Sequence, residues 1–507
     1  MKHKILILLG LVMLMGSCTK DFEKVNINPN APAAVPLNYL LSQSTLLLAG
    51  SAGDPGYKSW RANFIYAACM MQQMASVEVN FYRGTVYTFQ GDLSAAYFES
   101  SYPNSIKNLV NLIDLAGKDP KDVNIKSMAR ILRVIESTFL TDIYGDIPYS
   151  EAGRGFIDLN FSPAYDAQQA IYMDMLKELE EASKAFNPSA SKPTTADFIF
   201  GGDLDKWKRA ANSLMLRLAM RMQKVDPTNA QVWAKKAIDA GTMNSMDDTF
   251  AIKMDNTGAG NNSNANSWNL GAGRNIASGN NIQWAKTFID MMKTRKDPRL
   301  TVIAALKNGD RTLEKQRGIP SGTDATILST LAEKSLDNYS RAAPNMYALN
   351  NPYTIMTYSE SQFLKTEAIE RGWATGDAKA VFAAGQKAAI MQLNAYGGTL
   401  QDADAVAYGT ANPYPAAGTM DEKMSAIQTE SWLVNGAVMN HIEAWSDWRR
   451  TGFPKLIPVN YPGNETNGQI PRRLRYPQSE KGVNQNIDAA IARLGGDTFM
   501  NKMWWDK

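Results

Sequence analysis

The stretch KWKRAANSLMLRLAMRM, from Lys206 to Met222, decides the fold class of this chain. Its apolar residues recur at helical spacing and share one stripe, which consists of Trp207, Ala211, Leu214, Met215, Leu218 and Met222. The polar residues of the stretch that lie away from this stripe are Lys208, Arg209, Asn212 and Arg221. A period of about 3.6 residues is typical of an amphipathic helix. We therefore predict a helix that packs on its neighbours through the apolar stripe.

The same period recurs on both sides of this stretch. Residues 126–152 carry apolar residues at helical spacing and then reach a turn at Gly145–Pro148. Two more helices are predicted within residues 359–393, and Asp377 is a good N-cap for the second of them. Small residues on that helix, such as Gly385, allow the two helices to approach closely. Together with a predicted helix in residues 227–241, these segments look like tetratricopeptide-type helix pairs.

Composition places the chain among soluble globular proteins. Of its 507 residues, 20% are charged and 44% are hydrophobic, which fits neither a disordered chain nor a polytopic membrane protein. The formal net charge is only +3, and loss of the leader with Lys2 and Lys4 lowers it further. Because no strong basic field exists, we expect neither nucleic acid nor an anionic membrane surface to be a partner.

The first residues, MKHKILILLGLVMLMGSC, are typical of a bacterial lipoprotein signal. Two lysines precede an apolar run that is too short to span a membrane, and small residues then lead to Cys18. We predict a signal peptide over residues 1–17, acylation of Cys18 and a flexible tether over residues 18–36. The alternative is an ordinary signal peptide with an incidental cysteine. A single folded domain is then expected over residues 37–507.

Few residues are suited to metal or nucleophilic chemistry. Without the leader, and with Cys18 acylated, the chain keeps one free cysteine, Cys69, and one histidine, His441. A zinc cluster with histidine ligands is thereby excluded, and Cys69 lies in an apolar run that predicts a buried, inert thiol. We expect no cofactor, although loop oxygens of Asp and Asn leave a structural calcium ion open.

A loop-rich insertion is predicted around residues 250–350. The segment DNTGAGNNSNANSWNLGAGRNIASGNN, residues 255–281, is so rich in Gly, Asn and Ser that we expect neither a helix nor a buried strand in it. Aromatic rings in such polar surroundings suit stacking on a sugar ring or a peptide side chain. The candidate ligand contacts are Trp268, Asn269, Arg274, Tyr82, Arg83 and Trp60. The alternative for each is an anchor that packs its loop onto the body.

Near the C-terminus, EAWSDWRRTGFPKL places Glu443 and Asp447 on one face of a predicted helix. Such a pair could serve a glycosidase, but arginines nearby favour ion pairs that lower a carboxyl pKa. We therefore predict a structural charge cluster that ties the C-terminal segments to the helices. Its members are Glu443, Asp447, Arg449, Arg450, Arg472 and Arg473. His441 beside it is expected to be a hydrogen-bonded structural residue.

Eight motifs in this order resemble the SusD/RagB family of nutrient-binding outer-membrane lipoproteins, in its SusD-like branch. They are Cys18, NPNAP (28–32), DIYGDIPYSEA (142–152), WKRAANSLMLRLAMR (207–221), FLKTEAIERGW (363–373), EAWSDWRRTGFPKL (443–456), PRRLRYPQSE (471–480) and MWWDK (503–507). The resemblance implies a mostly α-helical fold. Tetratricopeptide-like pairs would form a right-handed superhelical scaffold, and the opposite, irregular side would bind ligand.

The resemblance also implies a function. A member of this family is anchored at the cell surface, captures oligosaccharide or peptide, and delivers it to a SusC-like TonB-dependent β-barrel transporter without cleaving it. Two alternatives stay open on the sequence alone. One is a secreted glycan-active hydrolase that uses Glu443 and Asp447, and the other is a lipoprotein that plugs its barrel and binds no free ligand. The nature of the ligand does not follow from the residues.

Overall fold

The structure is a computed structural model, and it describes residues 35–51, 57–256, 262–271 and 282–507. The predicted leader, the acylated Cys18, the tether up to residue 34 and the candidate contact Arg274 lie outside the described residues. Those predictions therefore stay predictions.

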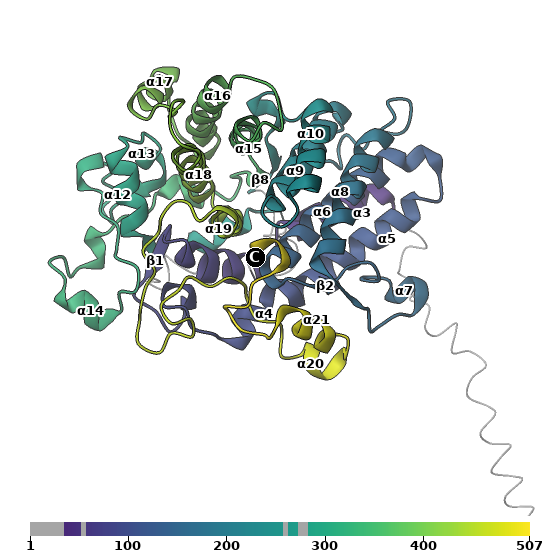
Figure 1. Ribbon diagram of the computed structural model, residues 1–507, viewed down its shortest axis with the longest axis horizontal. Helices are drawn as coiled ribbons and strands as arrows, with labels where there is room; N and C mark the ends of the chain where they lie inside the picture. The colour runs from purple at the N-terminus through teal and green to yellow at the C-terminus, as the bar shows by residue number, and fades with distance from the viewer. Residues whose placement is uncertain (1–34, 52–56, 257–261, 272–281) are drawn as a thin grey trace, which may run out of the picture.

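Most of the described chain is helical (Figure 1). The longer helices are α3 (Leu37–Leu48), α4 (Gly91–Ser100), α5 (Lys107–Ala116), α6 (Val123–Tyr144), α8 (Gln168–Ala185), α9 (Leu204–Arg221), α10 (Pro227–Asp239), α12 (Lys286–Thr294), α15 (Tyr358–Glu370), α16 (Ala378–Met391), α17 (Asp402–Ala411), α18 (Met420–Ala437) and α19 (His441–Thr451). The shorter ones are α7 (Gly155–Asp158), α11 (Ala265–Leu270), α13 (Leu300–Ile303), α14 (Ala325–Thr330), α20 (Glu480–Val483) and α21 (Ile487–Leu494). Two π-helices, η1 (Ser59–Ala68) and η3 (Ser101–Ile106), lie near the N-terminal end.

Short strands form four separate antiparallel pairs in the described chain. They are β1 (Met74–Ser76) with β5 (Ile282–Trp284), β2 (Ile147–Pro148) with β3 (Tyr165–Asp166), β4 (Phe250–Ile252) with β8 (Tyr353–Met356), and β6 (Ala304–Ala305) with β7 (Arg341–Ala342). The 3₁₀ helices used below are η2 (Arg83–Thr85), η5 (Met246–Asp248), η8 (Pro344–Tyr347) and η9 (Gln392–Tyr396).

The helices pack largely in sequence order. Each of α5, α6, α8, α9 and α10 contacts the next, and α15 contacts α9, α16 and α18. Figure 1 shows α9 and α10 beside α15, with α19 close to the centre of the molecule. The prediction of a mostly α-helical fold built from tetratricopeptide-like pairs is thus confirmed. No helix among the described segments combines the length and the apolarity that crossing a membrane would require.

The apolar stripe predicted for α9 is confirmed, and two of the polar residues that lie away from the stripe are buried as well. All six stripe residues are buried, but Arg221 is only 1% exposed and Asn212 is also buried. The reason is that α9 is covered on several sides, by α8, α10 and α15. Asn212 and Arg221 therefore meet other protein groups rather than water.

The segment 255–281 also differs from the prediction, because its middle forms the helix α11. Asn264 caps this helix by accepting hydrogen bonds from the backbone N–H groups of Asn266 and Ser267, at 2.8 and 3.1 Å. The capping amide is itself held, since it donates to the carbonyl oxygens of Asn351 and Pro352. An asparagine-rich stretch therefore becomes helical where one asparagine caps it and distant backbone fixes that cap.

The close approach of α15 and α16 yields a stability prediction. A Cβ atom at Gly385 would lie 2.7 Å from the Phe363 ring, whereas one at Gly409 in α17 would meet only a side-chain oxygen at 3.6 Å. Gly→Ala in a helix otherwise gains about 1 kcal/mol. We expect Gly409→Ala to keep or raise the free energy of unfolding in urea, and Gly385→Ala to lower it by about 1–3 kcal/mol. Equal effects at both sites would contradict the close packing.

Candidate ligand-binding site

A buried network of charged residues surrounds α19. Arg221 on α9 pairs with Glu443, and its other terminal nitrogen lies 3.6 Å from a carboxylate oxygen of Asp142 on α6. Arg217 lies 3.7 Å from Glu443 and holds Glu360 on α15 through two hydrogen bonds of 2.6 and 2.8 Å. All five side chains are almost inaccessible to solvent. The network therefore joins three scaffold helices to α19.

The second carboxylate of α19 has partners of its own. Asp447 accepts hydrogen bonds from Ser431 at 2.9 Å and from Arg450 at 3.3 Å. Arg450 also pairs with Glu367 on α15 at 2.8 Å. Arg449 places its guanidinium 3.8 Å from the centre of the Trp445 ring. The pair Glu443 and Asp447 is thus held inside the fold by arginines.

Arg472 and Arg473 tie down the C-terminal segment without meeting Glu443 or Asp447. Arg472 pairs with Asp506 and donates to the backbone oxygen of Arg449 at 3.0 Å. Arg473 pairs with Asp497 at 2.7 Å and donates to the carbonyl oxygen of Tyr144. The structure therefore links these arginines to α19 and α6 mostly through backbone oxygens. The sequence did not indicate with which carboxylate each arginine would form an ion pair.

The expected lowering of carboxyl pKa values is wrong for Asp447. Burial raises its pKa, and the neighbouring Glu443 adds to this, although Arg450 opposes it. Burial also raises the pKa of Glu360 to about 7 against the favourable field of Arg217. Desolvation therefore outweighs the ion pairs at both carboxyl groups.

His441 and Cys69 lie in the core. The Nδ1 atom of His441 lies 2.6 Å from the side-chain oxygen of Gln73, and its backbone N–H donates to Asn63. Burial lowers the His441 pKa to about 3 and raises the Cys69 pKa to about 12. The ring is thus neutral and the thiol protonated at ordinary pH, so neither group is poised for nucleophilic catalysis.

Two aromatic candidates for ligand contact are buried, so the structure does not place them on an open face. Trp60 is 5% exposed and its ring lies 4.7 Å from that of Phe81, while Tyr82 is 0% exposed. Both rings pack between η1 and the segment before η2. Arg83 is half-buried and its guanidinium lies 3.4 Å from the Thr88 hydroxyl. Trp60 and Tyr82 are therefore packed onto the body, which is the alternative that the sequence left open, whereas a ligand contact by Arg83 stays a prediction.

Trp268 and Asn269 lie together on α11. Trp268 is half-buried. Asn269 is 1% exposed, and neither polar atom of its side chain has a hydrogen-bond partner. Because a buried amide without partners is costly, this group marks a place where a ligand or water would be stabilised. Trp268 and Asn269 therefore share one short helix, and Arg274 lies outside the described residues.

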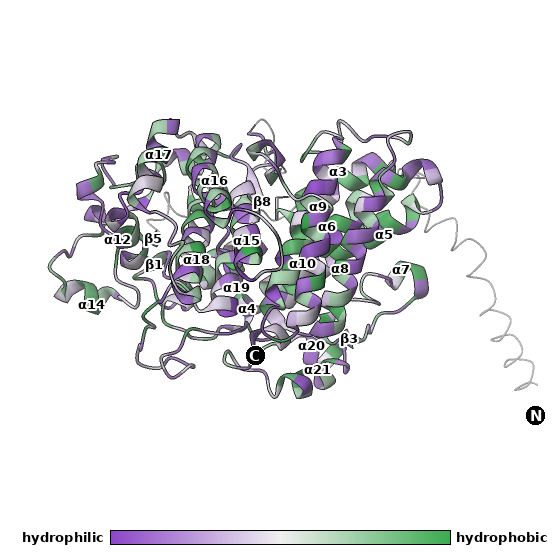
Figure 2. Cartoon of the chain, turned by 45° about the horizontal axis from the view of Figure 1, so that its top comes forward, coloured by the Kyte–Doolittle hydropathy of each residue, from purple (hydrophilic) through white to green (hydrophobic). Residues whose placement is uncertain are grey.

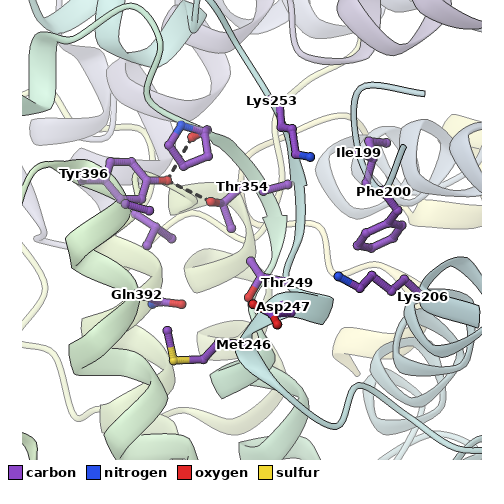
Figure 3. Close-up of a pocket in the computed structure, with 14 residues that line it drawn as sticks. Ile199, Phe200, Lys206, Met246, Asp247, Thr249, Lys253, Thr354, Gln392 and Tyr396 are labelled. Atoms are coloured by element: carbon purple, nitrogen blue, oxygen red, sulfur yellow. Dashed lines mark hydrogen bonds between the residues drawn. The ribbon is translucent and has the colours of Figure 1, made fainter. Parts of the chain in front are cut away.

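A cleft of about 370 Å³ opens between the scaffold and the strand pair β4–β8 (Figure 3). Its lining comes from the chain before α9, from η5, from both strands and from η9; the residues include Phe200, Lys206, Asp247, Lys253, Gln392 and Tyr396. The pairing of Ala251 with Thr354 forms one wall. The Tyr396 hydroxyl bonds Thr354 at 2.8 Å and donates to the carbonyl oxygen of Pro352 at 3.0 Å, which fixes its ring.

Several polar groups in this cleft lack partners. The Nε2 atom of Gln392 is buried and makes no hydrogen bond. Lys206 and Lys253 form no ion pair with any residue that the structure describes, and Figure 3 shows the Lys206 ammonium extending toward the middle of the cleft. The volume lies in the range of small-ligand pockets, and the mixture of ring faces and free donors suits a polar, hydroxyl-rich molecule. Sequence reasoning missed this site because its residues are spread between positions 199 and 438.

No group of three or more His, Cys, Asp or Glu residues in the described ranges is placed to hold a metal ion. A calcium ion bound by carbonyl and amide oxygens stays a prediction.

The raised pKa of Glu360 predicts a pH dependence of stability. Between about pH 4.5 and 7 the folded chain keeps the Glu360 proton while the unfolded chain releases it, so the free energy of unfolding falls as pH rises through this window. Relative to Glu360→Gln, the wild type should lose about 3 kcal/mol between pH 4.5 and 7.5 in urea unfolding. The exposed Glu314→Gln is the control. Parallel pH curves for wild type and Glu360→Gln would contradict the shift.

Comparisons with known proteins agree with this architecture. A model of the SusD-like family described as "Starch-binding associating with outer membrane" matches residues 29–477. A solved structure described as a chitin-binding protein is 31% identical, with a TM-score of 0.82, over 93% of this chain and 99% of its own. A Bacteroidetes SusD-like protein is 26% identical, with a TM-score of 0.80, over 93% of this chain and 100% of its own.

Another solved structure shares the fold at lower identity. It is described as a chitin-binding SusD homologue from Flavobacterium johnsoniae, and it is 24% identical, with a TM-score of 0.76, over 92% of this chain and 99% of its own. None of the curated protein sequences matches. The family match covers most of the chain and the structural matches cover nearly all of it. The chain therefore belongs to the SusD-like family.

Proposed function

We propose that this chain is a cell-surface glycan-binding lipoprotein that delivers oligosaccharide to a SusC-like TonB-dependent transporter. The family match over residues 29–477, together with 31% identity to a chitin-binding protein over nearly the whole chain, carries the proposal. A glycan is favoured over a peptide because that relative is described as binding a polysaccharide. An amide-containing sugar polymer is accordingly the first ligand to test.

Two surfaces are proposed to contact the glycan. The cleft of Figure 3 offers the ring of Phe200 and the ammonium of Lys206 on one side, and the unpaired Nε2 of Gln392 on the other. The second is α11, where Trp268 is half-buried and the next residue, Asn269, is a buried amide without a hydrogen-bond partner. A sugar ring stacks its apolar face on an aromatic ring while its hydroxyl and amide groups bond the polar side chains around it. Arg274 stays a proposed contact that neighbours this second surface in sequence.

The hydrolase alternative has little support at its proposed carboxylates. Glu443 and Asp447 are 1% and 5% exposed, and both pair with arginines. A glycosidase needs two carboxyl groups that flank a bond of the substrate. We expect product analysis with chitin oligosaccharides to show no cleavage by the wild type. Hydrolysis that Glu443→Gln abolishes would overturn the proposed role in binding.

Calorimetry with chitin tetrasaccharide tests the two contact surfaces. We expect Trp268→Ala to weaken binding about tenfold by removing a stacking face, and Gln392→Ala to weaken it about 3–10-fold by removing a hydrogen bond. Matched controls are Trp373→Ala, another half-buried tryptophan, and Gln169→Ala, an exposed glutamine. Binding of maltotetraose and of a tetrapeptide is measured in parallel. If the wild-type protein bound none of the three ligands, the result would instead support the alternative of a lipoprotein that plugs its transporter barrel and binds no free ligand.

Metabolic labelling tests the surface anchor. We expect radiolabelled palmitate to be incorporated into the wild type and not into Cys18→Ala, because the thiol of Cys18 is the proposed site of acylation. In intact cells, external protease should then reach the wild-type protein. Unlabelled wild-type protein that is released in soluble form from the periplasm would contradict the proposed anchor. Co-purification of a β-barrel transporter with the labelled protein tests the proposed delivery step.

A further inference from the structure

An apolar tip projects from the loop between β2 and β3. It consists of Phe156, Ile157, Leu159 and Phe161, of which Phe156, Leu159 and Phe161 are 83%, 75% and 74% exposed. Figure 2 shows hydrophobic colour on α7, which stands out from the body at one end of the molecule. Single exposed apolar residues are common on protein surfaces, but four within six residues are a contiguous apolar patch that indicates an interaction site.

The tip is held in place by its own loop. At the base, β2 pairs with β3, and the Asp166 carboxylate accepts the backbone N–H groups of Tyr149 and Ser150 at 3.1 and 2.9 Å. Higher up, the Glu151 carboxylate accepts hydrogen bonds from Asn160 and from the backbone of Ala164, each at 2.9 Å. These bonds order the loop while its large apolar side chains stay in solvent.

The backbone of the tip also favours outward side chains. Leu159 has a φ of 56°, in the left-handed region that a bulky residue rarely occupies. Gly153, with a φ of 74°, packs so closely on α5 that a Cβ there would lie 3.2 Å from the Cα of Lys107. The loop is therefore pressed against α5 at Gly153, and the ammonium of Lys107 on α5 lies 5.9 Å from the centre of the exposed Phe156 ring.

The tip lies on the side where the N-terminal segment joins the body. The first described helix, α3, packs on α5 and η3, and the loop of α7 packs on the same two elements. Figures 1 and 2 both show α3, α5 and α7 at the same end of the molecule. Cys18 precedes Val35 by 17 residues, a chain that reaches at most about 60 Å when extended. An acyl group on Cys18 would keep this end near the bilayer.

We propose that the apolar tip inserts into the headgroup region of the membrane that holds the acylated chain. The inference rests on the proposed attachment of lipid to Cys18. The observations favour lipid over a protein groove: the tip is convex, and four side chains are few for a protein interface of about 800 Å² per partner. Arg154 pairs with Asp158, so the tip brings little net charge and its affinity comes from burial of apolar side chains.

The insertion would give the protein a second attachment point. A flexible tether alone leaves the body free to rotate above the surface. A tip that enters the bilayer whenever the tether brings it near benefits from a high effective concentration, so a weak contact is sufficient. Tether and tip together would fix which end of the body faces the membrane.

A fluorescent probe tests the insertion in the full acylated chain. A Phe156→Cys variant is labelled with an environment-sensitive dye, while the buried Cys69 stays unlabelled and Cys18 is blocked by its acyl group. The control is the same dye at Ile457→Cys, whose native side chain is 85% exposed. Both are reconstituted in vesicles of phosphatidylethanolamine and phosphatidylglycerol that contain a headgroup-level quencher. We expect quenching at position 156 to exceed that at position 457 by roughly twofold or more.

A second variant separates the tip from general unfolding. Phe156→Ser/Leu159→Ser/Phe161→Ser is labelled at Tyr39→Cys, on the exposed start of α3. We expect the triple substitution to reduce quenching at position 39, while binding of chitin tetrasaccharide and incorporation of palmitate stay unchanged.

Each outcome decides between the proposals. Equal quenching at positions 156 and 457 in a palmitate-labelled chain overturns the insertion and leaves the proposed function intact. Absence of palmitate instead overturns the proposed anchor, and with it the insertion. Co-purification with a transporter that the triple substitution abolishes, without any quenching at position 156, would make the tip a protein contact and overturn the lipid contact.

Discussion

The ion pair between Arg221 and Glu443 is the contact on which the arrangement of the helices depends. It joins the end of α9 to α19 in the centre of the protein, and Asp142 and Arg217 extend it to α6 and α15. Such pairs are costly to bury, and removal of one partner costs about 3–5 kcal/mol because the other charge is left alone. An apolar cluster of similar volume could be as stable. The charges instead require one relative placement of four helices, which apolar contacts alone would specify less strictly.

The sequence predicted the helices of the scaffold because their information is local. An apolar period, an N-cap such as Asp377 and a small residue such as Gly385 each act within a few positions of the chain, and all three appear in the structure as expected. The burial of Arg221 was not predictable in this way, since its partner lies 222 positions away. The helix α11 was not predicted, for a similar reason. Its cap Asn264 is fixed by backbone oxygens at residues 351 and 352.

The candidate site was harder to predict than the fold. Trp60 and Tyr82 looked like ligand contacts because polar residues surround them in sequence, yet both rings are buried in the fold, Trp60 at 5% and Tyr82 at 0% exposed. Composition around an aromatic residue reports its neighbours along the chain and not its neighbours across the fold. The cleft of Figure 3 shows the converse case. Its lining is drawn from separate segments of the chain, and the pairing of β4 with β8 and the contact of Tyr396 with Thr354 help to bring these segments together.

The placement of carboxylates supports the proposal that this chain binds a glycan without cleaving it. Hydrolysis requires two carboxyl groups on opposite sides of the scissile bond, one of them able to donate a proton. Raised carboxyl pKa values, which a proton donor would need, occur at Glu360 and Asp447 deep in the helix network. The half-buried Glu480 also has a raised pKa because of its burial, but it accepts a hydrogen bond from Tyr165 and does not line the cleft. Among the described residues that line the cleft, Asp247 is the one carboxylate. The carboxyl groups with raised pKa values thus lie apart from the cleft, which agrees with the proposed role in binding rather than hydrolysis.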